Sequence, residues 1–138
     1  MTHRNFRRAL AAGFAVVAMS TATAGVATAE QAGGQGAQAN TCPALYFCLF
    51  YNSNRAGAIA TFFNADPDFA NDRFAGSGAG AGQVVKNNAA SAQNRQTGLI
   101  AQVWFNSNYG GPRDDVLPSN WRNLTATYND NASFNWRR

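Results

Sequence analysis

The sequence predicts an all-β domain, and two observations lead to that prediction. From Cys42 onward, short aromatic and β-branched runs alternate with Asn, Gly, Ser and Pro, and no stretch keeps the periodicity of an amphipathic helix. The second observation is an internal repeat, in which residues 50–57 align without gaps on residues 104–111. Each copy fits a strand, an Asn-rich turn, a Gly and a second strand, which describes a hairpin whose turn needs positive φ. Because a single hairpin is marginally stable in water, two such units are expected to pack face to face around one aromatic core.

Residues 1–29 have the composition of a secretory signal peptide. Residues 1–8 carry three arginines and no acidic residue, and residues 9–29 form an uncharged run that ends in small side chains suited to cleavage. The run is weakly apolar and interrupted by Ser and Thr, which favours cleavage over a membrane span. We therefore expect a secreted, extracellular protein with no membrane association after cleavage, exported by either the Sec or the twin-arginine route.

Composition excludes most catalytic chemistry for the exported chain. The single histidine, His3, lies in the predicted signal peptide, so no imidazole remains to serve as a base or a metal ligand. Asp114 and Asp115 are sequence neighbours that face opposite ways in an extended segment, which is poor geometry for paired acid–base catalysis. The arginines of residues 1–8 account for most of the net charge of +4, so charge does not indicate a nucleic-acid partner. We expect a protein that is not an enzyme and requires no cofactor.

The folded domain is expected to begin near the cysteines. Residues 30–41 consist mainly of Gly, Gln and Ala, without a large apolar side chain, which predicts a flexible leader. Cys42 and Cys48 are the only two cysteines, and in an exported chain such a pair is expected to be joined. Closing so short a loop contributes about 2 to 2.5 kcal/mol, so the disulfide reinforces the fold without defining it.

Apolar runs predict the individual strands. We expect strands at residues 46–51, 58–63, 83–86, 99–105 and 123–128. Residues 64–82 are the least strand-like, and their start at Asp66-Pro67-Asp68 predicts a turn or a short helix. A final strand with a solvated tail accounts for Trp136 and the arginines that follow it, in preference to stacking on nucleic acid or polysaccharide.

The repeated units resemble the Greek-key signature of βγ-crystallins, in which an aromatic residue, a second aromatic and a Gly are followed by a more distant Ser. The matching residues of the second unit are Trp104, Tyr109, Gly111 and Ser133. Those of the first unit are Phe50, Gly57 and Ser91, with Arg55 in place of the second aromatic. The resemblance implies a βγ-crystallin-like sandwich of two Greek-key motifs, about residues 42–95 and 96–138, within one domain at 42–138.

The signal peptide, the opening Cys42-Pro43 and the paired motifs resemble small secreted metalloproteinase inhibitors of actinobacteria. The resemblance implies a peptidase inhibitor, expected to be a monomer, whose partner is a secreted metalloproteinase. Such an inhibitor needs a rigid exposed loop whose ordering cost is met before binding. Our candidate lies between two prolines and offers two bulky apolar residues for a specificity pocket; it consists of Arg113, Asp114, Asp115, Val116 and Leu117. The competing interpretation is a crossover whose Val116 and Leu117 point inward.

Two Asn/Asp pairs followed by Ser support a second hypothesis. In many microbial βγ-crystallins similar pairs bind Ca²⁺ through oxygen ligands, and the matching positions here are Asn88 with Ser91 and Asp130 with Ser133. The competing interpretation is that these side chains pin the hairpins through hydrogen bonds to the backbone. The alternative function is an extracellular Ca²⁺-binding or structural module without inhibitory activity.

Overall fold

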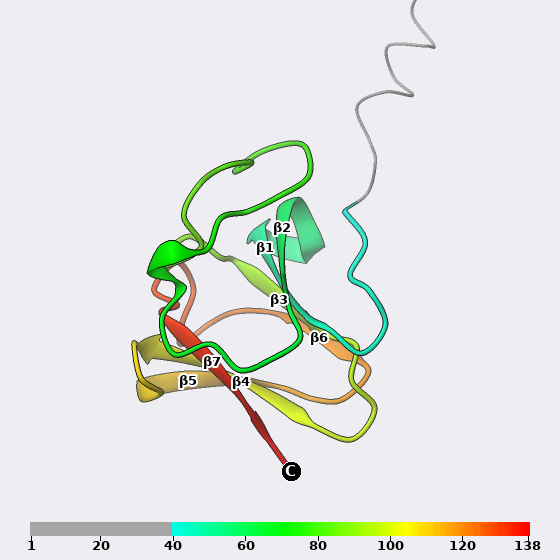
Figure 1. The fold of residues 1–138 in the computed structure, drawn as a ribbon, viewed down its shortest axis with the longest axis vertical. Coiled ribbons are helices and arrows are strands. Elements are labelled where there is room, and N and C mark those ends of the chain that lie inside the picture. Colours follow the sequence, from blue (N-terminus) through cyan, green and yellow to red (C-terminus); the bar gives the residue numbers. More distant parts are fainter. Residues whose placement is uncertain (1–39) are drawn as a thin grey trace, which may run out of the picture.

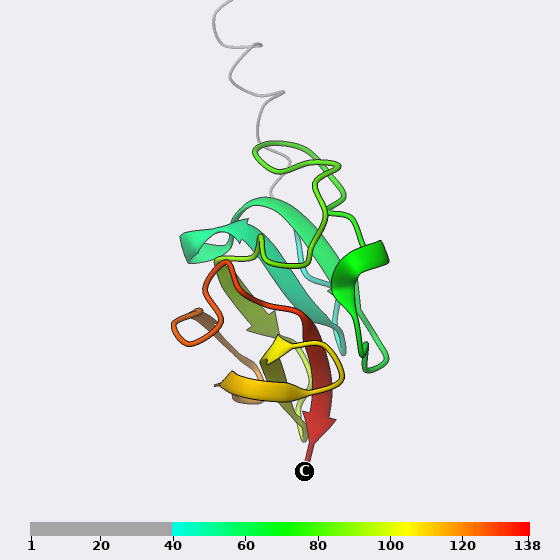
Figure 2. The same ribbon diagram turned by 90° about the vertical axis from the view of Figure 1, so that its left-hand side faces the viewer.

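A computed structural model of the protein describes residues 40–138, which form two antiparallel sheets packed against each other (Figures 1 and 2). The strands are β1 (Phe47–Asn52), β2 (Ala56–Phe62), β3 (Ser91–Asn94), β4 (Ile100–Asn106), β5 (Gly110–Val116), β6 (Asn120–Asn123) and β7 (Ser133–Arg137). The first sheet has the order β2-β1-β3-β6 and the second has the order β5-β4-β7. The predicted signal peptide and residues 30–39 of the predicted leader lie outside the described residues.

The two hairpins of the repeat have the same turn conformation. Between β1 and β2, Asn54 and Arg55 have φ values of 59° and 58°, and between β4 and β5, Asn108 and Tyr109 have φ values of 59° and 62°. A glycine with positive φ follows each turn, as the left-handed region favours. The prediction of two similar supersecondary units is therefore confirmed at the level of the backbone.

The two halves of the chain are interlocked. Strand β6, from the second half, pairs with β3 of the first half, with Gln93 opposite Trp121. In return, Asp66 of the first half exchanges two backbone hydrogen bonds with Phe134 of β7, at 2.9 and 2.8 Å. Neither half can therefore complete its hydrogen bonding without the other.

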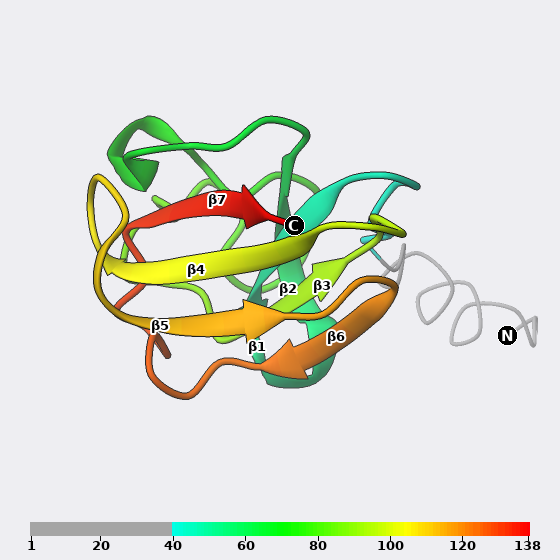
Figure 3. The same ribbon diagram turned by 90° about the horizontal axis from the view of Figure 1, so that it is seen from below.

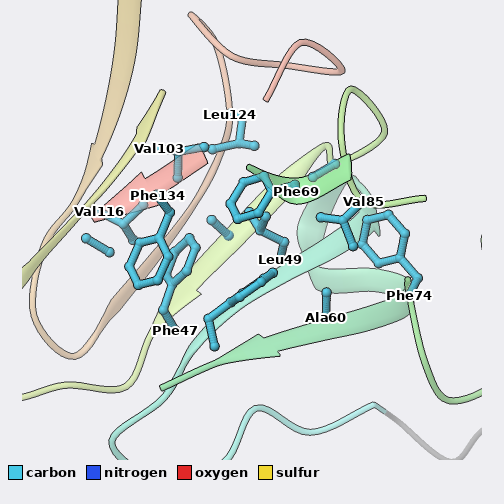
Figure 4. Packing of buried hydrophobic residues seen from close by; sticks show 14 of the residues in the cluster. Phe47, Leu49, Ala60, Phe69, Phe74, Val85, Val103, Val116, Leu124 and Phe134 are labelled. Carbon is cyan, nitrogen blue, oxygen red and sulfur yellow. The ribbon is translucent and has the colours of Figure 1, made fainter. Parts of the chain in front are cut away.

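The core lies between the sheets and is dominated by aromatic side chains (Figure 4). Phe47 of β1 and Phe134 of β7 stack across it with ring centroids 4.4 Å apart. Figure 4 shows Val85 and Phe74 at one side of the cluster and Val116 near Phe134 at the other. A smaller cluster covers the outer face of the first sheet and contains Cys42, Cys48, Phe50 and Ile59. The expected disulfide joins the two cysteines within it, with their Cα atoms 5.9 Å apart.

The structure corrects two predicted strands. Residues 83–86 are not a strand, although Val85 is fully buried, because their backbone forms an isolated bridge from Val84 to Arg73 and bonds to Asp72. The strand expected at 123–128 ends at Asn123, after which the chain turns. In both places the apolar residue fills the core from an irregular segment. The prediction of a turn or short helix after residues 66–68 is confirmed by η2 (Phe69–Asn71), which the Asp68 side chain caps.

Apolar runs did not predict strands β3 and β5, although the hairpin of the second repeat implies a strand after its turn. Their sequences, Ser-Ala-Gln-Asn and Gly-Gly-Pro-Arg-Asp-Asp-Val, contain few residues that favour strands. Each is paired along its length with an apolar neighbour, β1 or β4. Tertiary pairing therefore overrides the local preference in these two segments.

Replacement of Asn131 tests how much the contacts between the two halves contribute to stability. Its buried side chain accepts a hydrogen bond from the Ala89 N–H at 2.9 Å and donates one to the Val85 carbonyl at 3.0 Å. We expect Asn131→Ala to lower the free energy of unfolding by about 1 to 3 kcal/mol, because the buried Ala89 N–H loses its partner away from water, while the Val85 carbonyl keeps the hydrogen bond from the Asn88 N–H. Urea unfolding measures this loss. The exposed Asn64→Ala is the control, and a loss equal to that of the control would contradict the assignment.

Candidate functional site

The segment predicted as the protease-binding loop is mainly a strand. Arg113, Asp114, Asp115 and Val116 belong to β5, and Val116 is 1% exposed within the core. The expectation of an exposed loop is therefore corrected for these four residues, because pairing with β4 extends the backbone and the alternation of the strand turns Val116 inward. Leu117, the next residue, is 55% exposed. The inward-pointing alternative holds for Val116 but not for Leu117.

The two neighbouring aspartates of β5 face opposite sides of the sheet. Asp114 is 2% exposed and accepts hydrogen bonds from the backbone N–H and the hydroxyl of both Thr125 and Thr127, at 2.8 to 3.0 Å. Burial raises the pKa of Asp114, but these four hydrogen bonds outweigh it and hold the pKa below its usual value. Asp115 lies on the outer face, where it pairs with Arg113 and Arg137. Both carboxylates are thus occupied in structural roles.

A tight turn connects β5 to β6 and carries Leu117. The Leu117 carbonyl accepts a hydrogen bond from the Asn120 N–H at 3.2 Å, Pro118 restricts the backbone, and Ser119 has a φ of 54°. The Ser119 N–H donates to the Gln96 carbonyl at 2.8 Å, which ties the turn to the neighbouring connection. Leu117 is therefore an exposed apolar side chain on an ordered backbone.

Three connections meet at this end of the sandwich, and we call them the rim. The rim consists of residues 43–46 inside the disulfide loop, 95–99 between β3 and β4, and 117–119 between β5 and β6. Figure 3 shows the three connections at the same end, where β4 and β6 begin and β5 ends, and Figure 1 shows the same grouping. Hydrogen bonds join them, since residues 95 and 96 bond to Leu45 and Gln96 also bonds to Ser119.

Asn94 supports the rim from inside the molecule. Its side chain is fully buried and donates hydrogen bonds to the carbonyls of Leu99 and Val116, at 2.7 and 3.0 Å. Its side-chain oxygen accepts the Gln96 N–H at 2.9 Å. One amide therefore fixes the ends of β3 and β5 and the start of β4 relative to one another. Asn94, the last residue of β3, was not predicted from the sequence, because a polar residue in a segment with few strand-favouring residues gives no signal for this role.

A surface pocket of about 240 Å³ adjoins the Leu117 turn. Its lining consists of Asp115, Val116, Leu117, Asn120, Trp121 and Arg122. Trp121 is 39% exposed, so an aromatic surface lies beside the exposed leucine. Exposed apolar side chains grouped on an ordered backbone are a feature of protein-binding surfaces.

Three of the four residues proposed to bind Ca²⁺ have side chains that bond to the backbone. The Ser91 hydroxyl accepts the Arg55 N–H at 2.9 Å and donates to the Asn52 carbonyl at 2.7 Å. In the second unit Ser133 makes the equivalent bonds to Tyr109 and Asn106. Asn88 donates from its side-chain nitrogen to the carbonyls of Val84 and Lys86, and Asp130 is exposed. Both serines therefore pin the hairpins of the repeat.

Within residues 40–138, no three His, Cys, Asp or Glu side chains are grouped in a way that could hold a metal ion. None of the helical segments in this part of the chain has the length and apolar character needed to cross a bilayer.

Comparison with known proteins identifies the family. The model described as peptidase inhibitor family I36 matches residues 35–116, which is more than half of the chain. The chain belongs to peptidase inhibitor family I36. The family supports a peptidase inhibitor rather than an enzyme, with a peptidase as its partner. No curated protein matches the I36 chain in sequence.

Solved structures similar to this I36 member are βγ-crystallin domains. One, from work on the evolution of the eye lens βγ-crystallin domain fold, has 12% sequence identity and a TM-score of 0.55, covering 71% of this chain and 91% of its own. The N-terminal domain of protein S has 17% identity and a TM-score of 0.51, covering 67% of this chain and 94% of its own. At these identities the likeness shows the fold, and it confirms the predicted βγ-crystallin-like sandwich.

The I36 domain also contains an acidic cluster away from the rim. Burial raises the pKa of Asp72 to about 6, assisted by the charge of Asp66, a hydrogen bond with Asp66 and the charge of Asp68. Asp68 is exposed, and its ion pair with Lys86 at 2.9 Å lowers its own pKa. Burial, the neighbouring negative charges and a hydrogen bond that two carboxyl groups can share only while one holds a proton all favour the protonated form of Asp72.

Replacement of Asp72 tests this cluster. The folded state binds the Asp72 proton more tightly than the unfolded chain, so the free energy of unfolding should fall as the pH rises from about 4 to about 6. We expect Asp72→Asn to be more stable than the natural protein at about pH 7.5, by on the order of 1 kcal/mol, with no gain at about pH 4. Urea unfolding at the two pH values measures the difference. An equal gain for the exposed control Asp130→Asn would contradict the assignment to Asp72.

Proposed function

We propose that this protein is a secreted inhibitor of metallopeptidases that binds its target through the rim, with Leu117 as the first anchor. Membership of family I36 supports peptidase inhibition, and the disulfide between Cys42 and Cys48 fits an oxidising extracellular location. The rim is proposed as the binding site because the turn at Leu117 is both ordered and exposed. A metallopeptidase with an apolar specificity pocket is the target class that such a side chain fits.

Preorganisation is the physical basis of the proposal. Binding is weakened by the conformational entropy that a flexible loop loses when it is ordered on the target. A loop that is already fixed in the free inhibitor avoids this cost. The Leu117 turn is closed by its own hydrogen bond, restricted by Pro118 and tied to Gln96. Of the residues predicted for protease contact, Leu117 presents its side chain to solvent, while Arg113 and Asp115 lie on the neighbouring outer face of the second sheet.

Leu117 and Val116 make a matched pair for testing the proposal, because they are adjacent but face opposite ways. We expect Leu117→Ser to raise the inhibition constant for a thermolysin-like metallopeptidase by about 30-fold or more while leaving stability nearly unchanged. Val116→Ala should show the reverse, with a loss of about 1 to 3 kcal/mol in the free energy of unfolding and little change in inhibition below its melting temperature. Inhibition assays and urea unfolding on the same preparations separate the two effects.

The natural protein has to inhibit in this assay, with its disulfide intact and at stoichiometric excess. If it inhibits and Leu117→Ser inhibits equally well, the target does not contact this turn. If the natural protein inhibits serine or cysteine peptidases instead, the target class is wrong but the family function holds.

The alternative Ca²⁺-binding module makes a different prediction. A site that binds Ca²⁺ would stabilise the folded state by about 1.4 kcal/mol at tenfold excess over its dissociation constant, or several degrees in melting temperature. We expect millimolar Ca²⁺ to change the melting temperature by no more than Mg²⁺ does, because Ser91 and Ser133 already bond to the backbone. A rise specific to Ca²⁺ and abolished by Asp130→Ala would establish the alternative.

A further inference from the structure

The disulfide loop exposes a second leucine. Residues 43–45, Pro-Ala-Leu, are exposed between the buried Cys42 and the start of β1, and Leu45 itself is 48% exposed. The Tyr46 N–H donates to the Pro43 carbonyl at 3.3 Å, which closes a turn inside the loop. An apolar tip is therefore held by a covalent closure and by its own turn.

Leu45 has an unfavourable backbone conformation for its side chain. Its φ is 68°, in the left-handed region that a bulky L residue seldom adopts. Two hydrogen bonds maintain it, one from the Leu45 N–H to the Arg95 carbonyl at 3.3 Å and one from the Gln96 side chain to the Leu45 carbonyl at 2.8 Å. Glycine or asparagine would suit this position better for folding alone. A leucine that is both strained and exposed is the kind of residue that binding sites retain.

The same connection fixes Leu45 and Leu117. Gln96 donates from its side chain to the Leu45 carbonyl and accepts the Ser119 N–H at its own carbonyl. The connections that carry the two exposed leucines, residues 43–46 and 117–119, therefore lie at one end of the molecule with residues 95–99 between them (Figure 3). A stable protein complex buries roughly 800 Å² on each partner, which one short turn does not supply. A peptidase bound at the Leu117 turn therefore needs a further contact surface. The rim offers Leu45 as that surface.

We propose that Leu45 is a second anchor for the same target, so that the inhibitor binds the peptidase through two preformed apolar tips. This inference rests on the proposed function. The strain at Leu45 is retained because its side chain occupies an apolar depression beside the cleft that receives Leu117. The disulfide and the Gln96 side chain act as positioning elements for this tip.

Three substitutions of Leu45 separate binding from folding. Leu45→Gly relieves the unfavourable φ and removes the side chain, so we expect an equal or higher melting temperature together with an inhibition constant raised about tenfold or more. Leu45→Asn tolerates the left-handed conformation without the flexibility of glycine and should lose inhibition to a similar extent. Leu45→Met keeps an apolar side chain of similar volume and should stay within about threefold of the natural protein. Tyr128→Ser is the control, because Tyr128 is exposed and belongs to the connection after β6, which lies at the end of the sandwich away from the rim (Figure 3).

The outcomes distinguish this inference from the proposed function. If the natural protein inhibits and Leu117→Ser fails, but the Gly and Asn variants at position 45 inhibit normally, the second anchor is refuted and the first stands. If Leu45→Asn inhibits normally while Leu45→Gly does not, loop flexibility explains the loss and the anchor is again refuted. If the natural protein inhibits no metallopeptidase, the proposed function fails, and this inference fails with it.

Discussion

The fold depends on a small set of buried polar side chains that satisfy backbone groups in the connections. The strands are only four to seven residues long, so many N–H and C=O groups near the core have no partner in a sheet. Four fully buried side chains supply the missing bonds: Ser91, Asn94, Asn131 and Ser133. The serines close the two hairpins, Asn131 joins the halves, and Asn94 joins the sheets at the rim. An all-apolar core of the same shape would leave groups such as the Ala89 N–H unpaired.

The repeat is symmetric in its backbone but not in its side chains. At the position where the second hairpin has Tyr109, the first has Arg55, whose guanidinium carbon lies 4.7 Å from the ring centroid of Trp121 on β6. The aromatic group missing from the first hairpin is thus replaced by a cation–π contact with a ring from the other half of the chain. The contact between Arg55 and Trp121 is possible because β6 of the second half pairs with β3 and so lies beside the first hairpin.

The sequence predicted the parts of the structure that depend on local chemistry. The Asn-rich turns with their glycines, the disulfide and the aromatic core follow from residue types whose preferences are strong. Strands β3 and β5 and the orientation of Val116 depend on which neighbour a polar segment pairs with, and that information is not local. The left-handed backbone of Leu45 shows this most clearly, because a leucine side chain does not favour that conformation. Hydrogen bonds to Arg95 and Gln96, which are distant in the sequence, maintain it.

The match to family I36 ends at residue 116, one residue before the exposed turn. The family relationship therefore covers the disulfide loop, Asn94, Gln96 and β5, which together build the scaffold of the rim. Leu117 follows directly after that scaffold, and its position is set by Val116, which the core holds inward. Because successive residues of a strand face opposite ways, burying Val116 obliges Leu117 to point outward. The same packing that stabilises the sandwich thus orients the side chain that we propose the peptidase recognises.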